Sequence, residues 1–145
     1  MKAKPDAKVT NPLTAVTHSL NALGLKSIAL VSPYVDALNQ DMKIYFESIG
    51  IQVKAIGSFN QEDDKIVGKI SPMSIEKVVL ELGKNPEVDG VFVTCTNMRI
   101  AEKINDLEKI LGKPVTSSNH SMAWHALKIA GAVNSAEKSW GKLFN

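Results

Sequence analysis

The sequence predicts an α/β domain in which helices cover both faces of one parallel sheet. Short apolar runs alternate with longer segments whose apolar residues recur at helical spacing, and the connections between them are short. Several of these runs are apolar at nearly every position, which is typical of strands buried on both faces. Because such connections form right-handed crossovers, we expect a three-layer αβα arrangement. The expected sheet is a flavodoxin-like half-sheet of four parallel strands in the order 2-1-3-4.

The strands are assigned to four short segments rich in apolar and β-branched residues. Residues 27–32 (Ser-Ile-Ala-Leu-Val-Ser) are expected to form the first strand and residues 51–56 the second. Residues 90–94 (Gly-Val-Phe-Val-Thr) are expected to form the third, and the fourth, which is the shortest, covers residues 114–117.

The helices are assigned from apolar periodicity and from the residues at their ends. Asn11 followed by Pro12 predicts an N-cap and a first helical position, and Ser71 followed by Pro72 repeats this start. Glycine ends most of the periodic segments, because it readily adopts the left-handed conformation found after a helix. The apolar stripes cover residues 13–23, 38–49, 75–82, 100–111 and 119–130, and the closing glycines are Gly50, Gly83, Gly112 and Gly131.

Three segments lie outside this alternation, although residues 1–145 are expected to form one domain. Residues 1–10 are a tail that leads into a helix without a strand of its own. Residues 58–69 are polar and are expected to form a loop at the rim. Residues 133–145 are expected to form an amphipathic helix, which either packs on the domain's own sheet or binds a partner. Its apolar stripe consists of Trp140, Leu143 and Phe144.

Composition excludes several classes of function. The 145 residues include 17 basic and 15 acidic side chains, for a formal net charge of +2, and no basic cluster carries aromatics, so no nucleic-acid partner is expected. No apolar run is long enough to span a bilayer, and residues 1–8 lack the apolar core of a signal peptide. A single cysteine favours the reducing cytoplasm. His18, His120 and His125 lack metal-ligand spacing, so no metal site is expected.

Polar side chains gather at one edge of the predicted sheet. Ligands of a doubly wound sheet bind outside the carboxyl ends of the strands, where the strand order reverses, which is here between strands one and three. The opposite edge carries mainly lysines, glycines and acids. The polar segments at the carboxyl edge are Ser32-Pro33-Tyr34, Thr94-Cys95-Thr96-Asn97 and Ser117-Ser118-Asn119-His120.

Cys95 is the candidate nucleophile at this edge. It precedes a helix that is expected to begin near Met98, whose unpaired N–H groups and positive end would favour a thiolate. The same N–H groups, with the Thr96 hydroxyl and the Asn97 amide, are suited to holding a carboxylate or an enolate-like oxygen. The alternative is a small core thiol, because free cysteine is among the most buried residue types.

Other polar residues near this edge also have two interpretations each. Tyr34 is placed to donate its phenol to a bound carboxylate, or it is a plain loop tyrosine. His120 stands at the expected mouth and is a candidate for assisting proton transfer, with a capping or surface role as the alternative. Asp63 and Asp64 are expected to belong to a solvated loop rather than to act as a general base.

These residues carry a resemblance to a known superfamily. Residues 28–36 (Ile-Ala-Leu-Val-Ser-Pro-Tyr-Val-Asp), 88–97 (Val-Asp-Gly-Val-Phe-Val-Thr-Cys-Thr-Asn) and 112–119 (Gly-Lys-Pro-Val-Thr-Ser-Ser-Asn), followed by Trp124-His125, resemble the aspartate/glutamate racemase superfamily. Within it they are most similar to the maleate cis-trans isomerase and arylmalonate decarboxylase group. The motifs occur in order and at compatible spacing over nearly all of the chain, which is specific for the group but not for one reaction within it.

The resemblance implies that this chain is the second, C-terminal lobe of a two-lobe enzyme whose active site lies between the lobes. By this match Cys95 would be the catalytic cysteine of the second lobe, and Tyr34 would bind the substrate carboxylate. A family asparagine falls at Asp64, where an acid replaces an amide beside an anionic substrate. The other substrate-binding candidates are Ser32, Thr96, Asn97, Ser117, Ser118 and Asn119, with Asp64 and His120 as auxiliary residues.

The implied chemistry needs no cofactor and leaves three functions open. The first is an isomerase or racemase that acts on a small dicarboxylate or amino acid through the Cys95 thiol. The second is a lyase that decarboxylates a malonate-like acid, which is compatible with one cysteine. The third is a non-catalytic lobe that binds a small anion. A homo-oligomer or a separate first-lobe chain is the expected partner, because it would supply the missing half of the site.

Overall fold

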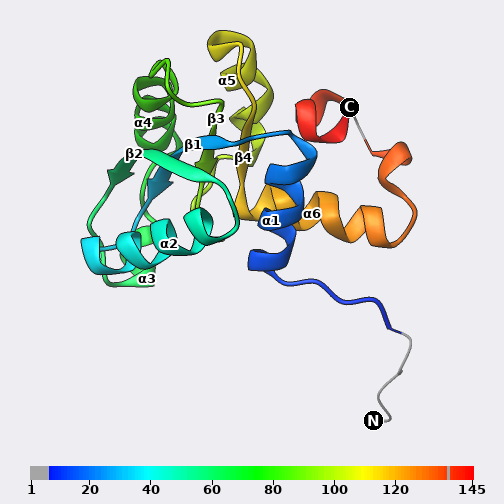
Figure 1. Ribbon diagram of the computed structural model, residues 1–145, viewed down its shortest axis with the longest axis horizontal. Coiled ribbons are helices and arrows are strands. Elements are labelled where there is room, and N and C mark those ends of the chain that lie inside the picture. The colour runs from blue at the N-terminus through cyan, green and yellow to red at the C-terminus, as the bar shows by residue number, and fades with distance from the viewer. Residues whose placement is uncertain (1–6, 137) are drawn as a thin grey trace.

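The sheet has the predicted topology. A computed structural model describes residues 7–136 and 138–145 of the chain. Its four-stranded parallel sheet has the order β2-β1-β3-β4 (Figure 1), so the expected order is confirmed. The strands are β1 (Ser27–Ser32), β2 (Gln52–Ser58), β3 (Gly90–Val93) and β4 (Val115–Ser117).

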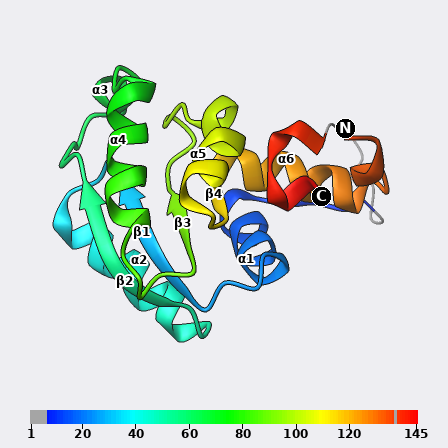
Figure 2. The same cartoon turned by 90° about the horizontal axis from the view of Figure 1, so that it is seen from above.

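Helices cover both faces of this sheet, as predicted. Helices α1 and α2 lie on one face and α4 and α5 on the other, while α6 packs along α1 and extends beyond the sheet (Figure 2). The helices are α1 (Pro12–Ala22), α2 (Asp36–Ser48), α3 (Asp64–Val67), α4 (Pro72–Gly83), α5 (Ile104–Leu111) and α6 (Ser118–Ile129). Short 3₁₀ turns are η1 (Ala101–Lys103), η2 (Val133–Ser135), η3 (Lys138–Trp140) and η4 (Lys142–Phe144). In the part of the chain that the structure describes, no helix has the length and apolar character needed to cross a membrane.

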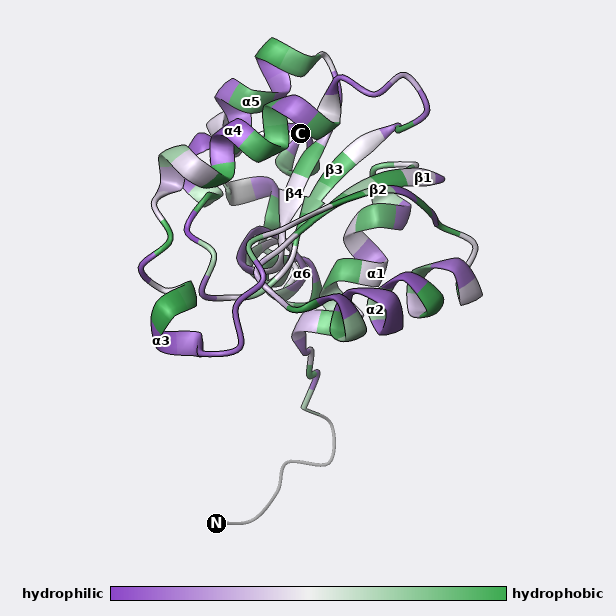
Figure 3. Ribbon diagram, turned by 90° about the vertical axis from the view of Figure 1, so that its left-hand side faces the viewer, coloured by the Kyte–Doolittle hydropathy of each residue, from purple (hydrophilic) through white to green (hydrophobic). Residues whose placement is uncertain are grey.

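The central strands are apolar on both faces, and each face has its own cluster of buried side chains. Ile28 and Leu30 of β1 pack toward α1 and α2, whereas Ala29 and Val31 pack toward α4 and α5. All four side chains are fully buried. The hydrophobic colouring of the strands between the two helix layers is visible in Figure 3. Burial on both sides therefore explains why these runs do not alternate with polar residues.

The predicted helix starts are also confirmed. The Asn11 side chain accepts a hydrogen bond from the Thr14 N–H at 2.9 Å, and the Ser71 hydroxyl accepts one from the Ser74 N–H at 3.1 Å. A proline follows each cap at the beginning of the helix. These caps satisfy N–H groups that have no partner inside the helix.

The C-terminal segment differs from the expectation of an amphipathic helix over residues 133–145. The described residues of this segment form three short 3₁₀ turns instead. Gly141, at a φ of 105°, interrupts any right-handed helix, and the next N–H, that of Lys142, donates to the buried Glu108 carboxylate at 2.7 Å. Leu143 and Phe144 are buried in a cluster with Trp124, so this segment packs on its own chain. Trp140, the remaining member of the predicted stripe, is 46% exposed.

The two other segments set apart by the sequence have different outcomes. The expected loop over residues 58–69 contains the short helix α3, which Asp63 caps by accepting a hydrogen bond from the Lys65 N–H at 2.8 Å. Val67 of this helix is buried, which anchors the segment to the core. Residues 1–6 of the expected tail lie outside the described residues, and residues 7–10 belong to no helix or strand.

Two glycines test how closely the sheet is packed. A methyl group on Gly90 would lie 2.7 Å from the Pro114 carbonyl oxygen and 2.9 Å from Leu25, whereas at Gly68 the nearest such atom is 3.7 Å away and φ is −61°. We expect Gly90→Ala to lower the free energy of unfolding by about 1–3 kcal/mol. Gly68→Ala should leave it unchanged or raise it by up to about 1 kcal/mol. Urea unfolding measures both values, and equal stability of the two variants would contradict this account of β3.

Candidate active site at the carboxyl edge of the sheet

Cys95 lies at the end of β3 in a backbone conformation that is unusual for its residue type. Its φ is 75°, in the left-handed region, and this costs a residue with a side chain on the order of 1 kcal/mol or more. The sulfur accepts a hydrogen bond from the Asn97 N–H at 3.4 Å, and the Met98 N–H donates to the Cys95 carbonyl at 3.1 Å. Cys95 is 8% exposed, at the border of the cluster that α4 and α5 cover. The N–H groups of the two residues Asn97 and Met98 therefore hold Cys95 in a tight turn.

The expected helix start near Met98 is wrong. The first helical turn after Cys95 is η1 at Ala101, and α5 begins only at Ile104. Met98 and Ile100 are buried while Arg99 between them is exposed, so this stretch alternates as extended chain does. The helix that follows Cys95 in the chain therefore does not begin beside the thiol. The Asn97 N–H takes the place of the helix N–H groups that the sequence led us to expect.

Tyr34 packs against the core cluster that contains Cys95. Burial raises the pKa of the Tyr34 phenol above its ordinary value, and the neighbouring Cys95 side chain raises this pKa further. The phenol consequently stays protonated and remains a hydrogen-bond donor at neutral pH. The half-buried phenol lies against the cluster that contains Cys95, and its role in binding a carboxylate stays a prediction. Cys95 is itself a buried member of that cluster, so its role as a nucleophile also stays a prediction.

The segment after β2 is tied to the segment that carries Tyr34. The Phe59 N–H donates to the Ser32 carbonyl at 3.0 Å, and the Gln61 N–H donates to the Pro33 carbonyl at 2.7 Å. The Ser58 hydroxyl also donates to the Tyr34 carbonyl. These bonds bring Asp64 close enough for its negative charge to contribute to the raised pKa of Tyr34. The Asp64 side chain itself is exposed.

The remaining predicted site residues divide into two groups. Thr96 and Asn97 are exposed beside the thiol, and the Asn119 side-chain amide donates to the Thr96 carbonyl at 2.7 Å. The serines serve the fold instead of a free ligand surface. Ser32 and Ser117 are buried and accept hydrogen bonds from the N–H groups of Tyr34 and His120, at 3.0 Å and 3.2 Å, and Ser118 is buried on the side of α1 and α2.

His120 does not stand at the mouth of the site, so its expected role in proton transfer is not supported. Its ring is 5% exposed, with Nδ1 3.0 Å from the Thr116 hydroxyl and Nε2 2.7 Å from the Trp140 carbonyl. Burial lowers the pKa of His120 to about 4, so the ring is neutral. Because the ring is neutral, Nε2 donates a hydrogen bond to the Trp140 carbonyl and Nδ1 accepts one from the Thr116 hydroxyl. His120 thus connects α6 to the C-terminal turns.

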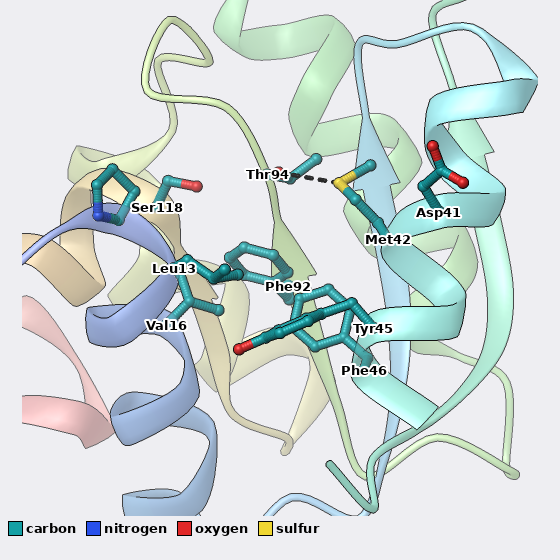
Figure 4. A pocket seen from close by; sticks show the side chains of 10 residues that line it. Leu13, Val16, Asp41, Met42, Tyr45, Phe46, Phe92, Thr94 and Ser118 are labelled. Carbon is teal, nitrogen blue, oxygen red and sulfur yellow. Dashed lines mark hydrogen bonds between the residues drawn. The ribbon is translucent and has the colours of Figure 1, made fainter. Parts of the chain in front are cut away.

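A second feature, which the sequence did not reveal, is an apolar groove between α1 and α2 (Figure 4). It has a volume of about 350 Å³ and lies against the β3 side chain of Phe92. The Thr94 hydroxyl points into it and donates to the Met42 sulfur at 3.6 Å. Leu13 at its rim is 50% exposed. The other residues that line the groove are Pro12, Val16, Asp41, Tyr45, Phe46 and Ser118.

The described residues contain no cluster of three or more histidine, cysteine or acidic side chains suited to a metal ion. The carboxyl edge carries the Cys95 thiol, whose sulfur accepts a hydrogen bond from the Asn97 N–H. The residues at this edge include buried Cys95, half-buried Tyr34 and exposed Thr96, beside an apolar core. Such an edge is suited to holding a carboxylate while the thiol exchanges a proton with a neighbouring carbon.

Comparisons with known proteins identify the family. A family model described as arylmalonate decarboxylase matches residues 1–144. Arylmalonate decarboxylase of Bordetella bronchiseptica is 26% identical over 137 residues, which are 94% of this chain and 57% of that protein. Maleate isomerase of Geobacillus stearothermophilus is 30% identical over 122 residues, or 84% of this chain and 49% of that protein. The chain spans about half the length of the curated relatives it matches.

Solved structures of the same proteins share the fold. A crystal structure of arylmalonate decarboxylase superimposes with a TM-score of 0.81 at 25% identity, covering 92% of this chain and 59% of that one. A serine variant of Nocardia farcinica maleate cis-trans isomerase, which holds a covalently bound succinylcysteine intermediate, has a TM-score of 0.85 at 24% identity. It covers 96% of this chain and 56% of that one, and at this identity it supports the fold alone.

The buried histidine makes stability depend on pH. Because the pKa of His120 is about 4 in the folded chain and 6.5 ordinarily, only the unfolded chain binds this proton between those values. The contribution of His120 to stability is complete above about pH 6.5 and decreases by up to about 3 kcal/mol as the pH falls to about 4. Urea unfolding at several pH values should show a steeper loss for the native protein than for His120→Gln. Parallel pH profiles would contradict the buried neutral ring.

Proposed function

Because the chain belongs to the arylmalonate decarboxylase family, whose model matches residues 1–144, we propose that it is the cysteine-bearing lobe of a cofactor-independent enzyme. Its substrate is a small carboxylic acid, a dicarboxylate or an amino acid, and its reaction is of the isomerase or racemase type. The observation that carries the proposal is the packing of Tyr34 against the cluster that contains Cys95, at the carboxyl edge of the sheet. Fold likeness alone would not distinguish a site from a packed core.

In the racemase version, the Cys95 thiolate removes the proton from the carbon next to a carboxylate. The electron pair of the broken C–H bond passes into an enediolate, whose negative oxygens accept hydrogen bonds from the Tyr34 phenol and the Thr96 hydroxyl. A protonated acid on the other face of the carbon then returns a proton. The described thiol is the only cysteine of the chain, so this second acid belongs to another lobe.

In the isomerase version, the same thiolate adds to a carbon–carbon double bond. A C–S bond forms while the second acid protonates the neighbouring carbon, and the new single bond rotates. Loss of that proton and cleavage of the C–S bond restore the double bond and the thiolate. The succinylcysteine intermediate of the Nocardia farcinica relative is the adduct that such a step produces from maleate.

A second candidate function, decarboxylation of a malonate-like acid, is favoured by the presence of one cysteine. Loss of carbon dioxide would leave the electron pair of the C–C bond in an enediolate. The Cys95 thiol would then deliver its proton to the carbon, and water would reprotonate the sulfur. This reaction needs one acid, whereas the first two reactions need two. A third reading, a non-catalytic lobe that binds a small anion, uses the same edge without a proton transfer.

We propose that a second lobe completes the site, supplied by a second copy of this chain or by a separate first lobe. The support is the length of the relatives, about twice that of this chain, and the apolar groove between α1 and α2. Leu13 is half-exposed in front of the aromatic side chains of the groove, so apolar surface is exposed to water there. This surface replaces the C-terminal stripe as the proposed contact, since Leu143 and Phe144 are already covered.

The proposed compartment is the reducing cytoplasm, where a lone thiol persists.

Proton exchange in heavy water tests the reaction. With candidate acids, the chain combined with its second lobe should exchange the proton at the carbon next to the carboxylate, and Cys95→Ser should slow this by about 100-fold or more. Tyr34→Phe should slow it by about 100-fold through loss of one donor to the enediolate. Ser48→Ala is the control, because it also removes a hydrogen-bonding hydroxyl, which donates to the Tyr45 carbonyl at 2.6 Å near the end of α2, and Ser48 does not line the groove.

The outcomes separate the three candidate functions. Exchange without release of carbon dioxide supports an isomerase or racemase. Release of carbon dioxide from a malonate with uptake of one deuterium supports the decarboxylase. Equal rates for Cys95→Ser and the native protein would refute a catalytic thiol.

Mass in solution tests the partner. A homo-oligomer should sediment above the 15.7 kDa of one chain, and Leu13→Asp should return it to that mass by placing a charge in the apolar contact. Met73→Asp is the control, because Met73 of α4 is 78% exposed and does not line the groove. A native protein that sediments as one chain at every concentration would contradict the homo-oligomer and leave the separate first lobe.

A further inference from the structure

We propose that Asn119 is a positioning residue for the Cys95 thiol and acts through the peptide group between Thr96 and Asn97. This inference rests on the proposed role of Cys95, and it assigns Asn119 a task other than the substrate contact expected from the sequence. The side-chain amide of Asn119 donates to the Thr96 carbonyl at 2.7 Å. The Asn97 N–H, which is the other end of the same peptide group, donates to the Cys95 sulfur at 3.4 Å.

A single planar unit therefore joins the two hydrogen bonds. The carbonyl and the N–H of a peptide group lie in one plane and point in opposite directions. Fixing the carbonyl of Thr96 consequently fixes the direction in which the Asn97 N–H points. Without the Asn119 amide, this peptide group would rotate more freely, and the N–H would spend less time aimed at the sulfur.

The bond from Asn119 also changes the strength of the second bond. A donor on a peptide carbonyl draws electron density toward the oxygen and makes the N–H of the same group a better donor. A better donor stabilises a thiolate more than a thiol, because its hydrogen bond to a charged acceptor is the stronger one. Asn119 is therefore expected to increase the thiolate fraction at Cys95 without touching the sulfur.

Little else from outside the loop holds this peptide group. Among the residues that the structure describes, the Asn119 bond is the only hydrogen bond that another element makes to the main chain of residues 95–97. The backbone of this loop is strained, because Cys95 has a left-handed φ of 75°, and a change to an ordinary φ would relieve that strain. The hydrogen bond from the Asn119 amide to the Thr96 carbonyl opposes this change.

Asn119 is well placed for this task. It is the second residue of α6, a helix that Ser117 caps through the His120 N–H at 3.2 Å and that packs along α1. The support for the thiol thus comes from a rigid element. Asn119 itself is exposed, so its replacement opens no cavity and removes no N-cap.

Alkylation of the full chain by iodoacetamide over a range of pH tests the proposal, because Cys95 is the only cysteine. Asn119→Ala should react about 2- to 10-fold more slowly than the native protein at pH 7, the loss expected for one hydrogen bond. The midpoint of its pH–rate profile should move to higher pH. Asn119→Asp keeps the shape but cannot donate and adds a negative charge, so its midpoint should move at least as far.

Asn21→Ala is the matched control, because Asn21 is an exposed asparagine near the end of α1, which leads into the start of β1 at the edge of the sheet opposite Cys95. It should leave the profile unchanged, and urea unfolding should show that all variants are folded. A native Cys95 that stays unreactive at every pH at which the unfolded chain reacts would contradict the proposed function itself. A reactive native thiol whose profile Asn119→Ala and Asn119→Asp both share would overturn the role of Asn119 and leave the proposed function intact.

Discussion

The rest of the structure depends on the burial of β1 and β3 on both faces. Ile28 and Leu30 need one helix layer, and Ala29 and Val31 need another, so the chain must cross the sheet on both sides. Right-handed crossovers then make the strands parallel and bring all their carboxyl ends to one edge. That edge is where Tyr34 packs against the cluster that contains Cys95. The position of the candidate site is thus a consequence of core packing.

Most of the fold was accessible from the sequence because its determinants are local or periodic. The caps at Asn11 and Ser71 use their own neighbours as partners, and the apolar runs of β1 and β3 are unambiguous. The strand order followed from the handedness of the crossovers. The C-terminal turns were missed because apolar spacing alone does not distinguish an α-helix from turns interrupted at Gly141. The buried carboxylate of Glu108, 34 residues upstream of Lys142, organises them.

The candidate site was predicted less completely, because each polar side chain can form hydrogen bonds with several different partners. The sequence placed Cys95 and Tyr34 at one edge, and the structure packs Tyr34 against the cluster that contains Cys95. The sequence could not reveal that Ser32 and Ser117 would bond to backbone N–H groups, or that the His120 ring would bond to the Trp140 carbonyl. Those choices depend on tertiary neighbours. The groove between α1 and α2 was missed for the same reason, since the apolar periodicity of a helix does not predict how much of its apolar face other elements will bury.

The left-handed backbone at position 95 has an evolutionary consequence. Glycine adopts this conformation without the steric penalty that a cysteine side chain incurs. Mutation to glycine would therefore relieve this backbone strain, but it would also remove the contacts that the buried sulfur makes in the core cluster. Selection for folding thus acts in opposite directions on the side chain at this position.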